Sequence, residues 1–199
     1  MIIITDPQLV SNEATILNAL FGEGLEILHL RKPDADVRQL SDLISQIDSR
    51  FHSRIMIHNH YELLDLFPLS GIHFTEKTND RQDEFANVTC KKSIAVHELS
   101  ELRHVKPLID YVFLSPLFPS VSKIGYSKQW DFEAMKLELT RKRDVEIVAL
   151  GGITLNNVKV IKELGFDNFA LLGSIWELAK AGCSTKQLID IYRKFNNEK

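Results

Sequence analysis

The feature that most constrains this fold is a regular alternation between short apolar runs and longer amphipathic segments. Eight runs rich in Ile, Val, Leu and Phe show little polar alternation, which is typical of parallel strands covered on both faces. The predicted strands are Met1–Thr5, Glu26–Leu30, Arg54–His58, Gly71–Phe74, Ser93–His97, Tyr111–Ser115, Glu146–Leu150 and Asn168–Leu172. Eight strand–helix repeats favour closure, so the sequence predicts an α/β fold, a single small (β/α)8 TIM barrel over residues 1–199.

The segments between these runs carry apolar side chains at helical spacing. The predicted helices are Glu13–Phe21, Val37–Phe51, Tyr61–Leu66, Glu98–Val105, Phe132–Arg143, Asn157–Glu163 and Thr185–Phe195. Asp36 and Ser184 are predicted N-caps, and the polar span Glu76–Cys90 is predicted to be a loop or a poorly formed helix. The main alternative is an open doubly wound sheet, but no Gly-x-Gly-x-x-Gly follows the first strand.

Charge and composition exclude several classes of partner. The net charge of −3 gives no basic footprint for nucleic acid or an anionic membrane. Cys90 and Cys183 have no metal-ligand spacing. The apolar run at Met1–Thr5 lacks a preceding basic region and is too short for a signal peptide, and no apolar stretch approaches the ~20 residues of a membrane span. We therefore expect a cytoplasmic protein.

A polar loop follows the sixth predicted strand and suits a phosphorylated ligand. Ser120, Ser122 and Lys123 lie within four residues of one another. Hydroxyl groups donate hydrogen bonds to phosphate oxygens, and an ammonium group adds a compact positive charge. Because the carboxyl ends of barrel strands meet at one face, this loop is predicted to border the active site.

Glycines at the ends of the last two strands indicate a phosphate site. Gly151-Gly152 follows the seventh strand and Gly173-Ser174 follows the eighth. Backbone N–H groups that no side chain shields can wrap phosphate oxygens, and loops after strands seven and eight often do so in barrels. Tight turns without a ligand are the alternative explanation.

Histidines and cations gather at the other strand ends. Five of the seven histidines fall there, namely His29, His58, His60, His73 and His97. Each could act as an acid, a base or a phosphate donor, or could simply fill the barrel. Arg31 and Lys32 close the second strand, and we expect Arg31 to face the mouth because His29 lies two residues before it. The strand ends offer no convincing carboxylate pair, so the residues alone predict no metal site.

These motifs, in this order, resemble the thiamine phosphate synthase and thiazole tautomerase superfamily. The similar segments are Leu28–Lys32, Ile57–Asn59, Gly71–Phe74, Ser93–His97, Leu114–Lys123, Ala149–Ile153 and Leu171–Ile175. The resemblance implies a transferase of thiamine biosynthesis. In that reaction an aminopyrimidine methyl pyrophosphate is joined to a thiazole phosphate, giving thiamine phosphate and pyrophosphate.

The resemblance also implies roles for individual residues. Arg31 would grip pyrophosphate and Asn59 would lie near the metal and the pyrimidine, while Gly152 and Gly173-Ser174 would bind the thiazole phosphate. The predicted catalytic residues are Arg31, Asn59, His97 and Lys123. The predicted substrate-binding residues are His29, Lys32, His58, His73, Ser120, Ser122, Gly151, Gly152, Gly173 and Ser174.

Magnesium is the cofactor that the resemblance implies, because it neutralises the departing pyrophosphate. The family's two magnesium aspartates align here with Asn59 and Thr78, so the site lacks two hard anionic ligands. Glu76, or pyrophosphate itself, would have to carry the ion. A homodimer is expected by analogy with other barrels only.

Two alternatives stay open. The chain could be a thiazole phosphate tautomerase, which needs no magnesium. That branch places its catalytic histidine where this chain has Pro116, so His58, His73 or His97 would have to supply the acid or base. The chain could also be a non-catalytic barrel that binds phosphorylated thiamine precursors.

Overall fold

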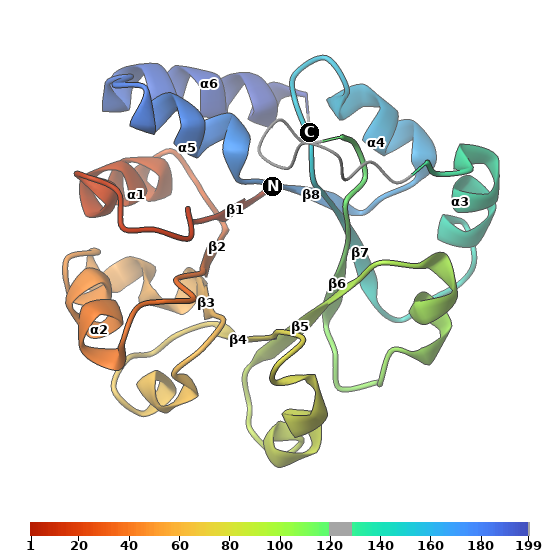
Figure 1. Cartoon of the computed structure of the whole chain (residues 1–199), viewed down its shortest axis with the longest axis horizontal. Coiled ribbons are helices and arrows are strands. Elements are labelled where there is room, and N and C mark those ends of the chain that lie inside the picture. Colours follow the sequence, from red (N-terminus) through yellow and green to blue (C-terminus); the bar gives the residue numbers. More distant parts are fainter. Residues whose placement is uncertain (120–128, 199) are drawn as a thin grey trace.

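The computed structural model describes residues 1–119 and 129–198. Its eight strands pair in parallel and in sequence order, and β8 pairs with β1, so the sheet closes into a barrel ringed by helices (Figure 1). The strands are β1 (Ile2–Ile4), β2 (Ile27–Leu30), β3 (Ile55–Ile57), β4 (Gly71–Phe74), β5 (Lys91–Val96), β6 (Tyr111–Leu114), β7 (Glu146–Leu150) and β8 (Asn168–Leu171). Each overlaps its predicted range, and the predicted (β/α)8 barrel is confirmed.

The helical layer mixes α-helices with short 3₁₀-helices. The α-helices are α1 (Glu13–Gly22), α2 (Val37–Ser45), α3 (Phe132–Leu139), α4 (Val158–Leu164), α5 (Gly173–Lys180) and α6 (Thr185–Asn197). The 3₁₀-helices are η1 (Ser49–Arg54), η2 (Tyr61–Asp65), η3 (Asn79–Phe85) and η4 (Leu99–His104). The connections on the β3 to β6 side thus carry 3₁₀-helices, and the span Glu76–Cys90, predicted to be a loop or a poorly formed helix, contains η3.

Side-chain caps define the helix starts that the sequence predicted. Asp36 begins α2 and Ser184 begins α6, each in a capping box with Gln39 or Gln187 three residues later. Gly165 ends α4 with φ +90°, a backbone conformation that glycine adopts without strain.

The predicted helix Val37–Phe51 is wrong in its second half. It ends at Ser45, and a new 3₁₀-helix starts after Asp48, whose side chain accepts from the Arg50 N–H. Asn18 of α1 fixes this break, because its amide group donates to the Gln46 carbonyl and accepts from the Asp48 N–H. A contact between two helices therefore overrides the local helical periodicity.

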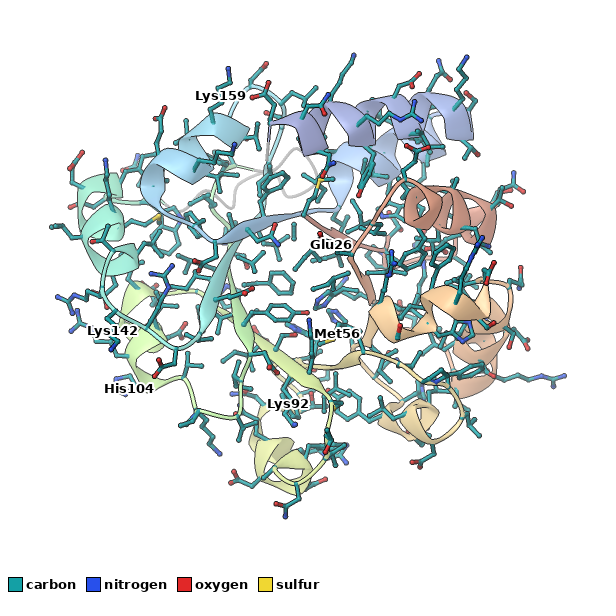
Figure 2. The ribbon with its side chains drawn as sticks, turned by 180° about the vertical axis from the view of Figure 1, so that it is seen from behind. Glu26, Met56, Lys92, His104, Lys142 and Lys159 are labelled. Atoms are coloured by element: carbon teal, nitrogen blue, oxygen red, sulfur yellow. The ribbon has the colours of Figure 1, made fainter. Side chains whose placement is uncertain are left out.

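The barrel interior holds an apolar cluster and, in contact with it, a group of buried polar side chains. Ile2, Ile4, Met56, Tyr111, Phe113, Val148 and Ala170 form one buried cluster. Buried His29, His58, His73 and Ser93 fill the side formed by β2 to β5. Figure 2 shows Met56 close to the barrel axis, whereas Lys142, Lys159 and His104 project at the periphery.

The larger core lies between the strands and the helices. Leu28 and Leu30 of β2 belong to it, as do Ile16, Leu17 and Leu20 of α1. Within the described ranges, no helix is both long and apolar enough to span a lipid bilayer.

Candidate active site

The carboxyl ends of the eight strands form one rim of the barrel, here called the mouth. Thr5, after β1, ties this rim to the end of β2. Its hydroxyl donates to the Arg31 carbonyl (3.1 Å) and accepts from the Arg31 N–H (2.8 Å). Side chains alternate along a strand, so His29 and Arg31 share the interior face while Lys32 turns toward the helices.

Arg31 lies half-buried at the mouth with its charge available. Its guanidinium group is close enough to His58 and His73 to add to the lowering of their pKa values, although burial contributes more. Over residues 1–119 and 129–198, no acceptor forms a hydrogen bond or ion pair with this guanidinium. Arg31 is therefore placed as expected and can receive an anion.

Lys32 occupies a different environment from its neighbour. Its ammonium group is buried between β2 and α1, 2.7 Å from Glu13 Oε1. It also donates to the carbonyl oxygens of Asp6 (2.7 Å) and Gln8 (2.6 Å). All three ammonium protons thus have acceptors inside the protein, and this arrangement leaves none for a ligand at the mouth.

Three buried histidines from adjacent strands, here called the histidine cluster, lie below Arg31. His29 Nδ1 is 3.0 Å from His58 Nε2, and the His58 and His73 rings lie 4.2 Å apart between centroids. Burial lowers the pKa of each histidine, to about 3 for His73. The cluster is therefore neutral near pH 7, and it offers hydrogen bonds and lone pairs rather than charge.

The outer nitrogens of the cluster are held by two residues of β5 and β6. His29 Nε2 lies 2.5 Å from the Tyr111 hydroxyl, and His73 Nδ1 lies 2.9 Å from Ser93 Oγ. Reasoning from sequence did not give either partner a role. The signal was present, because Ser93 and Tyr111 fall on the interior face of their strands and pair directly in register.

His97 is the most exposed of the histidines at the strand ends. Half of its side chain is exposed. Nδ1 donates to the Ser115 carbonyl (2.6 Å), and Nε2 lies 3.9 Å from Glu76. The contact with the Ser115 carbonyl therefore fixes the orientation of the ring at the mouth.

Gly151 and Gly152 bring the loops after β6 and β7 together. Both have positive φ, +102° and +63°. A Cβ on Gly152 would lie 2.4 Å from the Pro119 carbonyl oxygen and 2.6 Å from that of Phe118. These glycines therefore do more than form tight turns. They also let the backbones of the two loops approach closely at the mouth.

Gly173 and Ser174 form the first turn of α5, a helix that was not predicted. The helix begins immediately beyond β8, so its free N–H groups lie at the mouth, where the polarity of a helix N-terminus favours an anion. The Ser174 hydroxyl donates to the Ile153 carbonyl, which joins the loops after β7 and β8. Ser120, Ser122 and Lys123 fall outside the described residues.

Comparisons with other proteins agree with this geometry. The sequence profile described as thiamine monophosphate synthase matches residues 1–175. The chain belongs to the thiamine monophosphate synthase family. The chain is 25% identical over 180 residues to the thiamine-phosphate synthase of Serratia proteamaculans, covering 86% of this chain and 84% of that protein. The counterpart from Desulfitobacterium hafniense is 23% identical over 201 residues, with 96% of each chain covered.

A solved structure extends the similarity of this family member to three dimensions. The thiamine phosphate pyrophosphorylase of Bacteroides thetaiotaomicron has a TM-score of 0.85 and 30% sequence identity. The alignment covers 100% of this chain and 96% of that one. The family to which the motifs were compared is therefore confirmed.

The residues aligned with the family's magnesium ligands do not fit that ion. Asn59 offers a neutral amide whose Oδ1 is buried without a partner within the described residues, while its Nδ2 donates to the Lys32 carbonyl. Thr78 Oγ1 is already bonded to the Tyr61 hydroxyl and the Thr75 N–H. Glu76 is 92% exposed and lies 3.9 Å from His97 Nε2. A magnesium site built from carboxylates is thus not supported here.

Proposed function

We propose that this chain joins an aminopyrimidine methyl pyrophosphate to a thiazole phosphate, forming thiamine phosphate. The thiazole ring nitrogen attacks the methylene carbon, the bond from that carbon to the pyrophosphate oxygen breaks, and pyrophosphate leaves. The observation that carries the proposal is the Arg31 guanidinium, which has no partner among the described residues, at the mouth of a barrel whose family match runs over residues 1–175.

Arg31 supports the reaction through charge. The departing pyrophosphate gains negative charge as the bond breaks, and a cation fixed where that charge develops lowers the barrier. The neutral histidine cluster beneath Arg31 adds polar groups without adding charge. Because the aligned residues do not fit magnesium, no step is assigned to that ion.

The loops after β7 and β8 would bind the second substrate, the thiazole phosphate. The N–H groups at Gly152 and at the Gly173-Ser174 turn would hold the thiazole phosphate, so that the ring nitrogen faces the methylene carbon. Asn59 would contact the pyrimidine through Oδ1, which has no hydrogen-bond partner in the part of the chain that the structure describes. Lys123, Ser120 and Ser122 keep their predicted roles at the pyrophosphate, and the homodimer and the cytoplasmic location also stay predictions.

The test is direct assay of thiamine phosphate from the two precursors, with the wild type and Arg31→Gln. We expect product with the wild type and a loss of roughly 100-fold or more in kcat/KM for the variant, the scale seen when a group that stabilises developing charge is removed. Arg38→Gln is the matched control, because Arg38 is an exposed residue of α2. Equal activity in wild type and Arg31→Gln would contradict the proposal.

A thiazole phosphate tautomerase is the second candidate, and the observation that favours it is His97. Its exposure and its fixed Nδ1 suit an acid or base better than the buried His58 or His73. If the chain fails to form thiamine phosphate but isomerises the thiazole, and His97→Gln abolishes that activity, this candidate replaces the first. If phosphorylated precursors bind and neither reaction occurs, the barrel is a binding protein.

A further inference from the structure

The histidine cluster has the geometry of a metal site. His29 lies in β2, His58 directly follows β3, and His73 lies in β4. Each can offer one ring nitrogen so that the three atoms lie within 4.8 Å of one another, and this is the one such grouping of three His, Cys, Asp or Glu side chains in the described part of the chain. In a tetrahedral zinc site, nitrogens at 2.0–2.1 Å from the ion stand roughly 3.3 Å apart, so small ring rotations would suffice.

Hydrogen-bond partners orient two of the three imidazoles, as they do in protein metal sites. The nitrogens of His29 and His73 that face outward contact the Tyr111 hydroxyl and Ser93 Oγ, and such partners orient metal-binding imidazoles. His58 is 6% exposed, and its Nδ1 is buried with no hydrogen-bond partner in the described structure. His58 would bind through Nε2, which faces His29, so Nδ1 would carry its ring proton and the case for the metal rests on the three facing nitrogens.

We propose that His29, His58 and His73 bind one d-block dication, Zn²⁺ or a close relative, inside the barrel. Neutral imidazole nitrogens suit zinc, cobalt, nickel or copper, whereas magnesium prefers oxygen ligands. The fourth coordination position faces the mouth. The site is therefore chemically distinct from a carboxylate site for magnesium.

Protons must rearrange when the metal enters. His29 Nδ1 and His58 Nε2 share one proton at 3.0 Å, and a metal needs both lone pairs. The His29 proton moves to Nε2, where the Tyr111 hydroxyl oxygen accepts it. The imidazoles stay neutral throughout, so binding adds the full charge of the dication to the barrel.

Arg31 determines what fills the fourth position. It is the charged side chain that acts on His58 and His73, and it would repel a bare dication. An anion placed between the metal and Arg31 would satisfy both, and inorganic phosphate or pyrophosphate has the required charge. We therefore expect metal affinity to rise when either anion is present.

The test is a titration of the metal-free protein with Co²⁺, followed by displacement with Zn²⁺. The expected result is one Co²⁺ per chain with the strong visible absorption of four-coordinate cobalt, and tighter binding when phosphate is added. His58→Gln and His73→Gln should weaken metal binding by at least about tenfold. Ser93→Ala should weaken it by about tenfold, because His73 Nδ1 loses the hydroxyl group that orients its ring. His52→Gln should bind as the wild type, because His52 is buried elsewhere with its Nε2 on the Ile44 and Ile47 carbonyls.

Two outcomes would overturn the proposed metal site. If the folded wild type takes up no Co²⁺ or Zn²⁺, or shows the weak absorption of six-coordinate cobalt, the proposal is overturned without any variant. If His58→Gln and His73→Gln fold and bind as tightly as the wild type, it is also overturned. These measurements need no thiamine precursor, so they are independent of the proposed function.

Discussion

The side chains of Arg31 and Lys32 point in opposite directions at the end of β2. Arg31 lies at the mouth, where it can bind a ligand, whereas Lys32 is buried and has a structural role. His29 and Arg31 share the interior face, as their spacing of two residues predicted. The same alternation sends Lys32 outward, where Glu13 of α1 receives it at 2.7 Å. Sequence spacing could give the direction of Lys32. It could not give the partner, because Glu13 belongs to another element.

Lys32→Met is expected to destabilise the fold. The change leaves Glu13, 3% exposed, as a buried carboxylate without its cation, at a cost of about 3–5 kcal/mol. Urea denaturation measures this difference. Lys136→Met is the matched control, because Lys136 is exposed on α3 and its loss should change the free energy of unfolding by less than about 0.5 kcal/mol. A Lys32→Met protein as stable as the wild type, but weaker in binding substrate, would contradict this assignment.

The histidine cluster predicts a pH dependence of stability. The pKa of His73 is about 3 in the folded protein, below its ordinary value of 6.5, because burial and then Arg31 disfavour the imidazolium. The unfolded chain therefore binds more protons at intermediate pH. This contribution to stability is complete above pH 6.5 and falls as the pH is lowered toward 3.

Chemical denaturation at a series of pH values, with a chelator present, measures this effect. The free energy of unfolding should decrease between roughly pH 6.5 and pH 5, above the range in which most carboxylates titrate. His73→Gln should show a shallower decrease over the same range, since its side chain does not titrate. Identical pH slopes for wild type and variant would show that His73 is accessible and charged in the folded state.

At the scale of elements, local sequence patterns predicted the strands and the helix N-caps. They did not predict where every helix ends or that α5 forms. Asp36 and Ser184 carry their own capping signals within four residues. The break after Ser45 depends instead on Asn18, which lies on another helix. The helix α5 was not predicted because the Gly173-Ser174 pair fits a phosphate-binding turn as well as it fits the first turn of a helix.

Gly152→Ala tests the contact between the loops after β6 and β7. The new Cβ would lie within 2.6 Å of two carbonyl oxygens, so the loop at Phe118 and Pro119 must move. We expect lower stability together with a loss of activity that exceeds the stability effect. Gly182→Ala is the matched control, because Gly182 has φ +89° and open space around its Cβ position.

The control should show only the cost of a left-handed alanine, about 1 kcal/mol, with kcat/KM unchanged. Thermal unfolding and the synthase assay together measure both effects. Equal losses of stability and unchanged activity in both variants would mean that the approach of the two loops does not matter for the site.

On the scale of the whole molecule, barrel closure gathers residues that lie far apart in the chain. Eight parallel strands bring Arg31, His97, Gly152 and Gly173 to one rim, as the repeating pattern predicted. The polar histidine side of the interior could not be foreseen in detail. Alternation showed which residues face inward, but the hydrogen bonds to Ser93 and Tyr111 depend on how the strands lie side by side.

The central claim is that pyrophosphate is bound and released at this mouth, against Arg31. A crystal structure of the protein with thiamine phosphate and pyrophosphate tests it most directly. The account predicts pyrophosphate within hydrogen-bond distance of the Arg31 guanidinium, and the phosphate of thiamine phosphate at the Gly152 and Gly173 backbone. Pyrophosphate bound away from the carboxyl rim, with Arg31 left without an anion, would contradict it.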